Sequence, residues 1–123
     1  MSQFKNTQMA QRFGFAWAGI VAAWRREVSF RIQICIALIL PVVLLLLRPP
    51  TVWWALCVMA AMGVLAAELF NTALEALIDH LHPAIHPAIK FAKDCAAGAV
   101  LIVSAGALVM GILTALIALG VLS

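Results

Sequence analysis

The feature that most limits how this chain can fold is the length of its uncharged apolar stretches. Residues 32–47 and 52–67 contain no charged side chain, and a third segment, from about 89 to 121, is apolar after its first turns. Hydrophobic residues make up 66% of the 123 residues, and a soluble domain of that size has too little interior to bury them. Helices of this composition instead fit the hydrocarbon layer of a bilayer. The sequence therefore predicts an all-α membrane protein with three transmembrane helices, in a single domain over residues 1–123.

Charges and prolines set the expected ends of the first membrane helix. We predict this helix over 32–47, between Arg31 and Arg48, with a kink at Pro41. Two prolines in succession follow Arg48 and cannot continue a helix, so residues 48–51 are predicted to form a tight turn.

The second helix is expected to be longer than the bilayer requires. No Gly or Pro interrupts the sequence from residue 64 to 81, which predicts one helix over 52–80 that leaves the membrane after about residue 67. Two His-Pro pairs then predict a loop over 82–88, followed by a third helix over 89–121.

The N-terminal segment has the pattern of an amphipathic helix. Phe13, Trp17, Ile20 and Trp24 recur at the spacing of one helical face over residues 4–27, with most of the polar residues off that stripe. Aromatic side chains on such a helix suit the headgroup boundary, which predicts a helix on the membrane surface. The alternative is a helix that packs on another protein.

The distribution of basic residues predicts the topology. Seven of the eight Lys and Arg residues lie in the N-terminal segment or near the second loop, and only Arg48 lies in the first turn. The positive-inside rule then places the N-terminus and residues 80–93 in the cytoplasm and the C-terminus outside. Because no long run of cations occurs, the net charge of +3 does not indicate nucleic-acid binding.

Polar residues on the second helix are the strongest sign of function. Glu68, Asn71, Thr72, Glu75 and Asp79 are spaced so that they share one face of a helix. Glu68 follows Trp53 by fifteen residues, which is a depth of about 22 Å in a hydrocarbon layer of about 30 Å, and Glu75 lies about 10 Å further. An acid inside a membrane is costly unless it is paired or functional, so Glu68 is predicted to act on a lipid headgroup. The shallower acids alternatively solvate the helix end or pair with Lys90, Lys93 or Arg25.

Other charged and titratable groups are predicted at the same boundary. Glu27 ends the surface helix, and Lys93 and Asp94 open the third membrane helix. A set of ligands that are all carboxylate oxygens favours Mg²⁺ over zinc. His82 and His86 are separated by prolines that prevent them from forming a helical ligand pair, although His86 can contact a nucleotide from the loop.

Three sequence blocks together resemble a known family. Residues 68–79 read Glu-x-x-Asn-Thr-Ala-x-Glu-x-x-x-Asp, residues 24–31 read Trp-x-x-Glu-x-x-Phe-Arg, and residues 92–101 begin with Ala-Lys-Asp. In this order and spacing over residues 8–103 they resemble the small prokaryotic diacylglycerol kinases, which include the undecaprenol kinases. The resemblance implies ATP- and Mg²⁺-dependent phosphorylation of a lipid hydroxyl in the inner membrane, by a homotrimer whose active sites are shared between chains.

The resemblance also implies roles for individual residues. By position, Glu68 corresponds to the general base, and Glu27 and Glu75 to the metal ligands. The residues implied to bind the nucleotide are Glu27, Glu75, His86, Lys93 and Asp94. The residues implied to contact the lipid are Trp24, Arg31, Glu68, Asn71 and Ala97.

Several alternatives stay open at this point. Diacylglycerol is the predicted lipid, although the sequence that begins at His86 also resembles the undecaprenol-kinase branch. The chain departs from many relatives at Gln8, where they have arginine, and at Gln33, where they have glutamate. Outside this family, Glu68 suits a small proton-coupled transporter, and a holin-like structural protein would not need these acids at all.

Overall fold

The computed structural model describes residues 2–123, with side chains from residue 8 onward, so Lys5 lies outside the described side chains. The fold consists of four α-helices: α1 (Ser2–Arg26), α2 (Val28–Leu47), α3 (Thr51–Leu81) and α4 (Pro87–Ala118). No strand occurs over the described residues. Helices α2, α3 and α4 are each long and apolar enough to cross a membrane, which confirms the prediction of three such helices in an all-helical protein.

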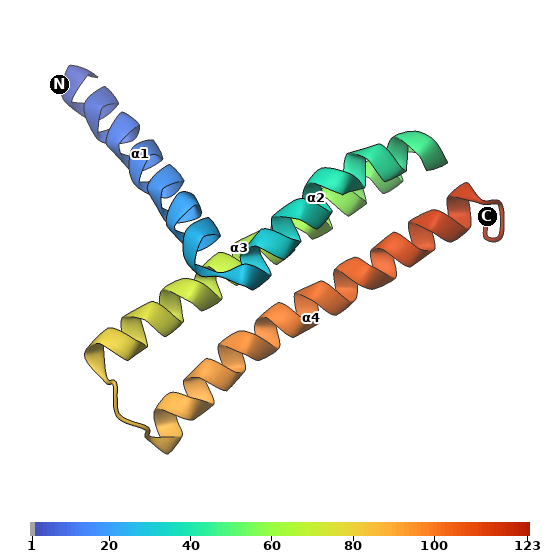
Figure 1. Ribbon diagram of the computed structural model, residues 1–123. Helices are drawn as coiled ribbons and strands as arrows, with labels where there is room; N and C mark the ends of the chain where they lie inside the picture. Colours follow the sequence, from blue (N-terminus) through green and yellow to red (C-terminus); the bar gives the residue numbers. More distant parts are fainter. Residues whose placement is uncertain (1) are drawn as a thin grey trace.

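Helix α3 is central to the arrangement because it contacts each of the other three helices. Figure 1 shows α3 and α4 running antiparallel along most of their length, with α2 beside the first part of α3. Helix α1 projects away from the other three, and the last part of α3 extends beyond the start of α2. The turn between α2 and α3 and the C-terminus lie at one end, and the turn between α3 and α4 at the other.

The break between α1 and α2 occurs at Glu27. This residue has an extended backbone (φ −113°, ψ 112°), while its carbonyl accepts the first hydrogen bond of α2, from Arg31 N at 3.2 Å. Helix α2 therefore begins at Val28, earlier than the predicted start at residue 32. The difference arises because Arg31 marks the edge of the apolar segment, whereas nothing in the preceding three residues stops a helix.

The turn between α2 and α3 agrees with its two prolines. Helix α2 continues through Pro41 and ends at Leu47, and Arg48 then adopts a left-handed conformation (φ 53°) with its N–H bonded to Leu44 O at 2.8 Å. This is a common way for a helix to end before residues that cannot extend it. Thr51, which the sequence pattern places in the turn, is the first residue of α3.

The start and end of α4 differ from the predicted helix over 89–121. Helix α4 begins at Pro87, because a proline is tolerated in the first helical turn, where its missing N–H is not needed. The His86 side chain caps this end, since its Nδ1 accepts a hydrogen bond from Ala88 N at 3.1 Å. At the other end α4 stops at Ala118, and Gly120 takes a positive φ of 77° in the following turn. The loop is therefore shorter than the predicted 82–88.

Few side chains are buried within the chain itself. The buried apolar side chains described are Ala23, Phe30, Leu44, Cys57 and Val64. Most large apolar side chains of α2, α3 and α4 are exposed along the helices. Contact of such apolar surfaces with lipid or with further copies of the chain is favourable, whereas their contact with water is unfavourable.

A buried polar contact joins α3 to α4. Thr114 Oγ1 donates to Met110 O at 2.7 Å, and it lies 3.2 Å from Cys57 Sγ. Because the Thr114 hydroxyl proton is already used, the Cys57 thiol must be the donor in the second contact.

Replacing Thr114 by valine is expected to destabilise the fold by about 1 kcal/mol, because the shape is kept while the Cys57 thiol loses its acceptor. The measurement is the midpoint of unfolding in detergent micelles. Cys35→Ala is the matched control, since Cys35 is exposed and is expected to leave the midpoint unchanged. Equal stability of Thr114→Val and the unaltered protein would show that the contact contributes nothing.

Candidate functional site

The polar face of α3 is more buried than its charge would suggest. Glu68 is only 8% exposed and is the one charged side chain classed as buried among those described. Asn71 and Glu75, one and two turns further along, are half-buried. Asn71 Nδ2 donates to Glu75 Oε1 at 3.3 Å, so the amide orients this carboxylate. The buried Asn71 Oδ1 has no hydrogen-bond partner among the described residues.

Glu27 adds a third carboxylate at the break between α1 and α2. The charges of Glu27 and Glu75 both act on Glu68, so the three carboxylates form one electrostatic group, here called the carboxylate cluster. Over residues 8–123 none of the three forms an ion pair. Uncompensated negative charge at a partly buried site is costly, and a bound cation would neutralise it.

The carboxylate cluster does not form a closed metal site. The described residues contain no group of three or more His, Cys, Asp or Glu side chains close enough to enclose an ion. Magnesium usually takes only one or two protein carboxylates, with phosphate oxygens and water completing its shell. Two carboxylates would therefore be enough for a magnesium site of this kind.

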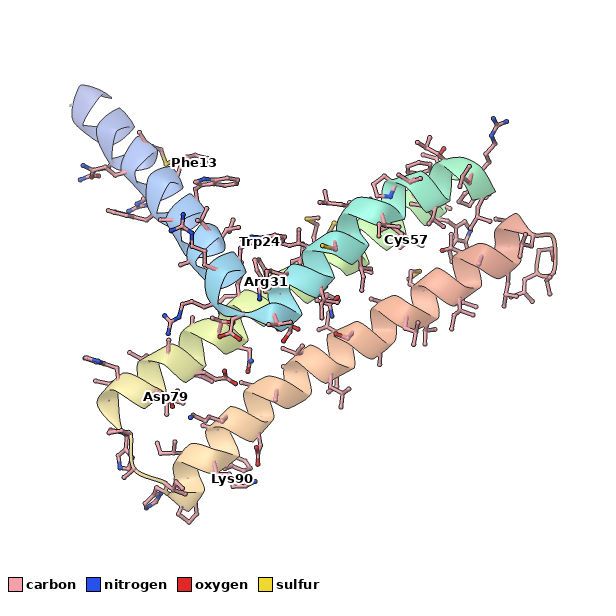
Figure 2. All side chains as sticks on the ribbon, in the orientation of Figure 1. Phe13, Trp24, Arg31, Cys57, Asp79 and Lys90 are labelled. Carbon is pink, nitrogen blue, oxygen red and sulfur yellow. The ribbon has the colours of Figure 1, made fainter. Side chains whose placement is uncertain are left out.

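A second charged group lies where α3 and α4 approach the loop between them. Lys93 of α4 forms an ion pair with Asp79 of α3, and Lys90 binds Asp94 at 2.5 Å within α4. Figure 2 shows Asp79 and Lys90 at this end of the molecule. The hydrogen bond and the charge of Asp94 raise the pKa of Lys90, which is exposed at the start of α4. Asp79 thus contacts α4, in agreement with the alternative, raised from the sequence, that the shallower acids pair with nearby basic residues.

The four residues of these two ion pairs and the loop between α3 and α4 line a cavity of about 220 Å³. This cavity is here called the loop pocket. His82 and His86 also line it, with their ring centroids 6.0 Å apart and the rings at 76° to each other. His86 Nδ1 is occupied as the cap of α4, and His82 Nδ1 lies 3.0 Å from Ala84 O. The structure therefore brings His86, Lys93 and Asp94 together, while the two histidines do not form a ligand pair.

The residues assigned to the lipid are more dispersed. Trp24 is exposed near the end of α1, and Arg31 is half-buried in the first turn of α2. Figure 2 shows both near the junction of α1 and α2. Ala97 is exposed on α4, one turn beyond Asp94.

An apolar groove of about 440 Å³ between α1 and α3 was not found from the sequence. Its α3 wall includes Leu69, Thr72 and Ala76, which neighbour the carboxylate cluster along the helix. Its α1 wall is built largely of small residues, including Ala16, Gly19 and Ala23. The small residues were a visible signal in the sequence, but only the packing of α1 against α3 turns them into a groove.

Comparison with known proteins identifies relatives of the chain. The family model described as prokaryotic diacylglycerol kinase matches residues 14–115, a range that contains every candidate site residue. A diacylglycerol kinase of Synechocystis sp. is 35% identical over 100 residues, which are 80% of this chain and 57% of that relative. The chain therefore spans little more than half the length of that protein.

Two further relatives are matched over most of their length. The diacylglycerol kinase of Escherichia coli (strain K12) is 31% identical over 96 residues, which are 78% of this chain and 79% of the relative. The undecaprenol kinase of Bacillus subtilis (strain 168) is also 31% identical, over 101 residues and 82% of each chain.

Proposed function

The chain belongs to the prokaryotic diacylglycerol kinase family, and on this premise we propose that it transfers the γ-phosphate of ATP to the hydroxyl of diacylglycerol, giving phosphatidic acid. Membership of the family indicates a lipid kinase, which favours this activity over a transporter or a structural membrane protein. The observation that carries the proposal is the burial of Glu68 on a membrane helix, beside Glu27 and Glu75 and without an ion-pair partner among the described residues.

Glu68 is the general base of the proposed reaction. The lipid hydroxyl oxygen attacks the γ-phosphorus, the bond to the oxygen that bridges the β- and γ-phosphates breaks, and ADP leaves. The hydroxyl proton passes to the Glu68 carboxylate. Such transfer asks mainly for positioning and charge stabilisation, which side chains on rigid helices supply.

The other candidate residues bind the two substrates. Glu27 and Glu75 would hold Mg²⁺, which would neutralise charge on the phosphates. The remaining nucleotide contacts are His86, Lys93 and Asp94 around the loop pocket. The lipid is held near Glu68 by Trp24, Arg31, Asn71 and Ala97.

The protein is an inner-membrane protein of bacteria, and we propose the following assembly within that membrane. The N-terminus and residues 80–93 are cytoplasmic, the C-terminus is outside, and α1 lies on the membrane surface with the exposed Phe13 and Trp17 in the headgroup layer. Three chains form a homotrimer with shared active sites. Support comes from the many apolar side chains that one chain leaves exposed.

A side-by-side kinase assay tests the lipid. With Mg-ATP in mixed micelles, diacylglycerol is expected to be phosphorylated about tenfold faster than undecaprenol, a ratio typical of discrimination by an apolar site. Reactions without ATP or with a chelator provide the background. Faster phosphorylation of undecaprenol would assign the chain to the activity of its Bacillus relative, and phosphorylation of neither lipid would overturn the proposal.

A further inference from the structure

Two charged residues without a role in the proposed reaction form ion pairs with two residues that have one. Lys93 and Asp94 are consecutive on α4, and each is bound by a residue from outside this pair. Asp79 of α3 forms an ion pair with Lys93 of α4. Lys90 forms an ion pair with Asp94, one turn further along α4. All four line the loop pocket.

The geometry of a helix explains why Lys93 and Asp94 need such partners. Consecutive residues on an α-helix point about 100° apart and do not face each other, so these two cannot hold one another. A free lysine also loses rotamer entropy when it binds a phosphate. An ion-pair partner that already restricts the side chain reduces that loss on binding.

Stability alone does not explain these pairs. Asp79 and Asp94 each have side chains 62% exposed, and that of Lys90 is 72% exposed. Exposed ion pairs of this kind contribute little to folding. Their location on a pocket lined by two lysines and two carboxylates is better explained by binding of a charged substrate.

We propose that Asp79 and Lys90 are positioning residues for the nucleotide, which act by holding Lys93 and Asp94 in place. This inference rests on the proposed function, because it assigns the loop pocket to ATP. Asp79 has the larger effect, since it fixes a cation that contacts phosphate and it bridges two helices. Lys90 acts within one helix, so its effect is smaller.

Asp79→Asn tests the inference through the separate kinetic constants. The KM for Mg-ATP is expected to rise about tenfold, while kcat stays within about twofold and the KM for the lipid is unchanged. Asp79→Glu, which keeps the charge, is expected to restore most of the affinity. His80→Asn is the matched control, because His80 is the adjacent exposed residue and does not line the pocket. A structural role would instead change the unfolding midpoint and the KM values for both substrates.

A double-mutant cycle shows whether Asp79 acts through Lys93. The KM for Mg-ATP in Asp79→Asn/Lys93→Met is expected to equal that in Lys93→Met alone, and multiplied effects would overturn the inference. If Asp79→Asn fails to assemble, Lys90→Gln tests the second pair with the same constants, and an unchanged KM there would overturn it. An inactive unaltered protein would instead contradict the proposed function, so the two failures are distinguishable.

Discussion

Replacing Glu68 by glutamine is expected to reduce transfer of phosphate to the lipid by roughly 10³-fold, within the 10²–10⁴ range of general-base catalysis. Glutamine has nearly the same shape and still accepts hydrogen bonds, but it cannot take the hydroxyl proton. The substitution also removes a buried charge that the charges of Glu27 and Glu75 repel, so the fold is expected to persist. The measurement is the initial rate of transfer of label from γ-labelled ATP to the lipid.

Nucleotide binding provides the internal control for this substitution. Because Glu68 is assigned to the lipid hydroxyl, Glu68→Gln is expected to bind Mg-ATP with unchanged affinity, as measured by equilibrium titration. If Glu68→Gln loses both Mg-ATP binding and the transfer rate, Glu68 would instead be assigned to the nucleotide site. An undiminished rate in an assembled protein would show that the carboxylate is not the base.

The existence of the helices could be predicted from the sequence, but their ends could not be placed in every case. The uninterrupted sequence up to Leu81 predicts that α3 continues beyond the apolar part, and the structure confirms this. The predicted helix ends were wrong where one residue is compatible with two local structures. Pro87 can end a loop or begin a helix, and Arg31 can mark the membrane edge without ending a helix.

The candidate site was predictable only where one helix determines it. The 3.6-residue period places Glu68, Asn71 and Glu75 on one face, and the structure shows the hydrogen bond from Asn71 to Glu75. Contacts between helices depend on how the helices pack, which the pattern of one helix does not contain. The sequence therefore could not decide that Lys93 pairs with Asp79.

Replacing Glu75 by glutamine is expected to raise the Mg²⁺ concentration for half-maximal activity by about 100-fold. Loss of a residue that only hydrogen-bonds to a metal ligand already lowers metal affinity by about 10–100-fold. Loss of a direct ligand is therefore expected to lower it by an amount at the upper end of this range. The substituted glutamine retains an oxygen that can accept the bond from Asn71 Nδ2, so the position of the side chain is kept while its charge is lost. The measurement is the rate of lipid phosphorylation as Mg²⁺ is titrated at fixed ATP.

Asn71→Ala separates the charge of Glu75 from its orientation. This variant keeps the Glu75 carboxylate but removes its hydrogen-bond donor, so the Mg²⁺ requirement, measured at saturating lipid because Asn71 is also assigned to lipid binding, is expected to rise only about tenfold. Glu75→Gln is therefore expected to need more metal than Asn71→Ala, and both are expected to recover rate as Mg²⁺ increases. Glu68→Gln differs from both because no concentration of metal replaces a missing base. If the rate of Glu75→Gln falls without any change in its dependence on Mg²⁺, then Glu75 is not a metal ligand, and the carboxylate cluster must bind the nucleotide in another way.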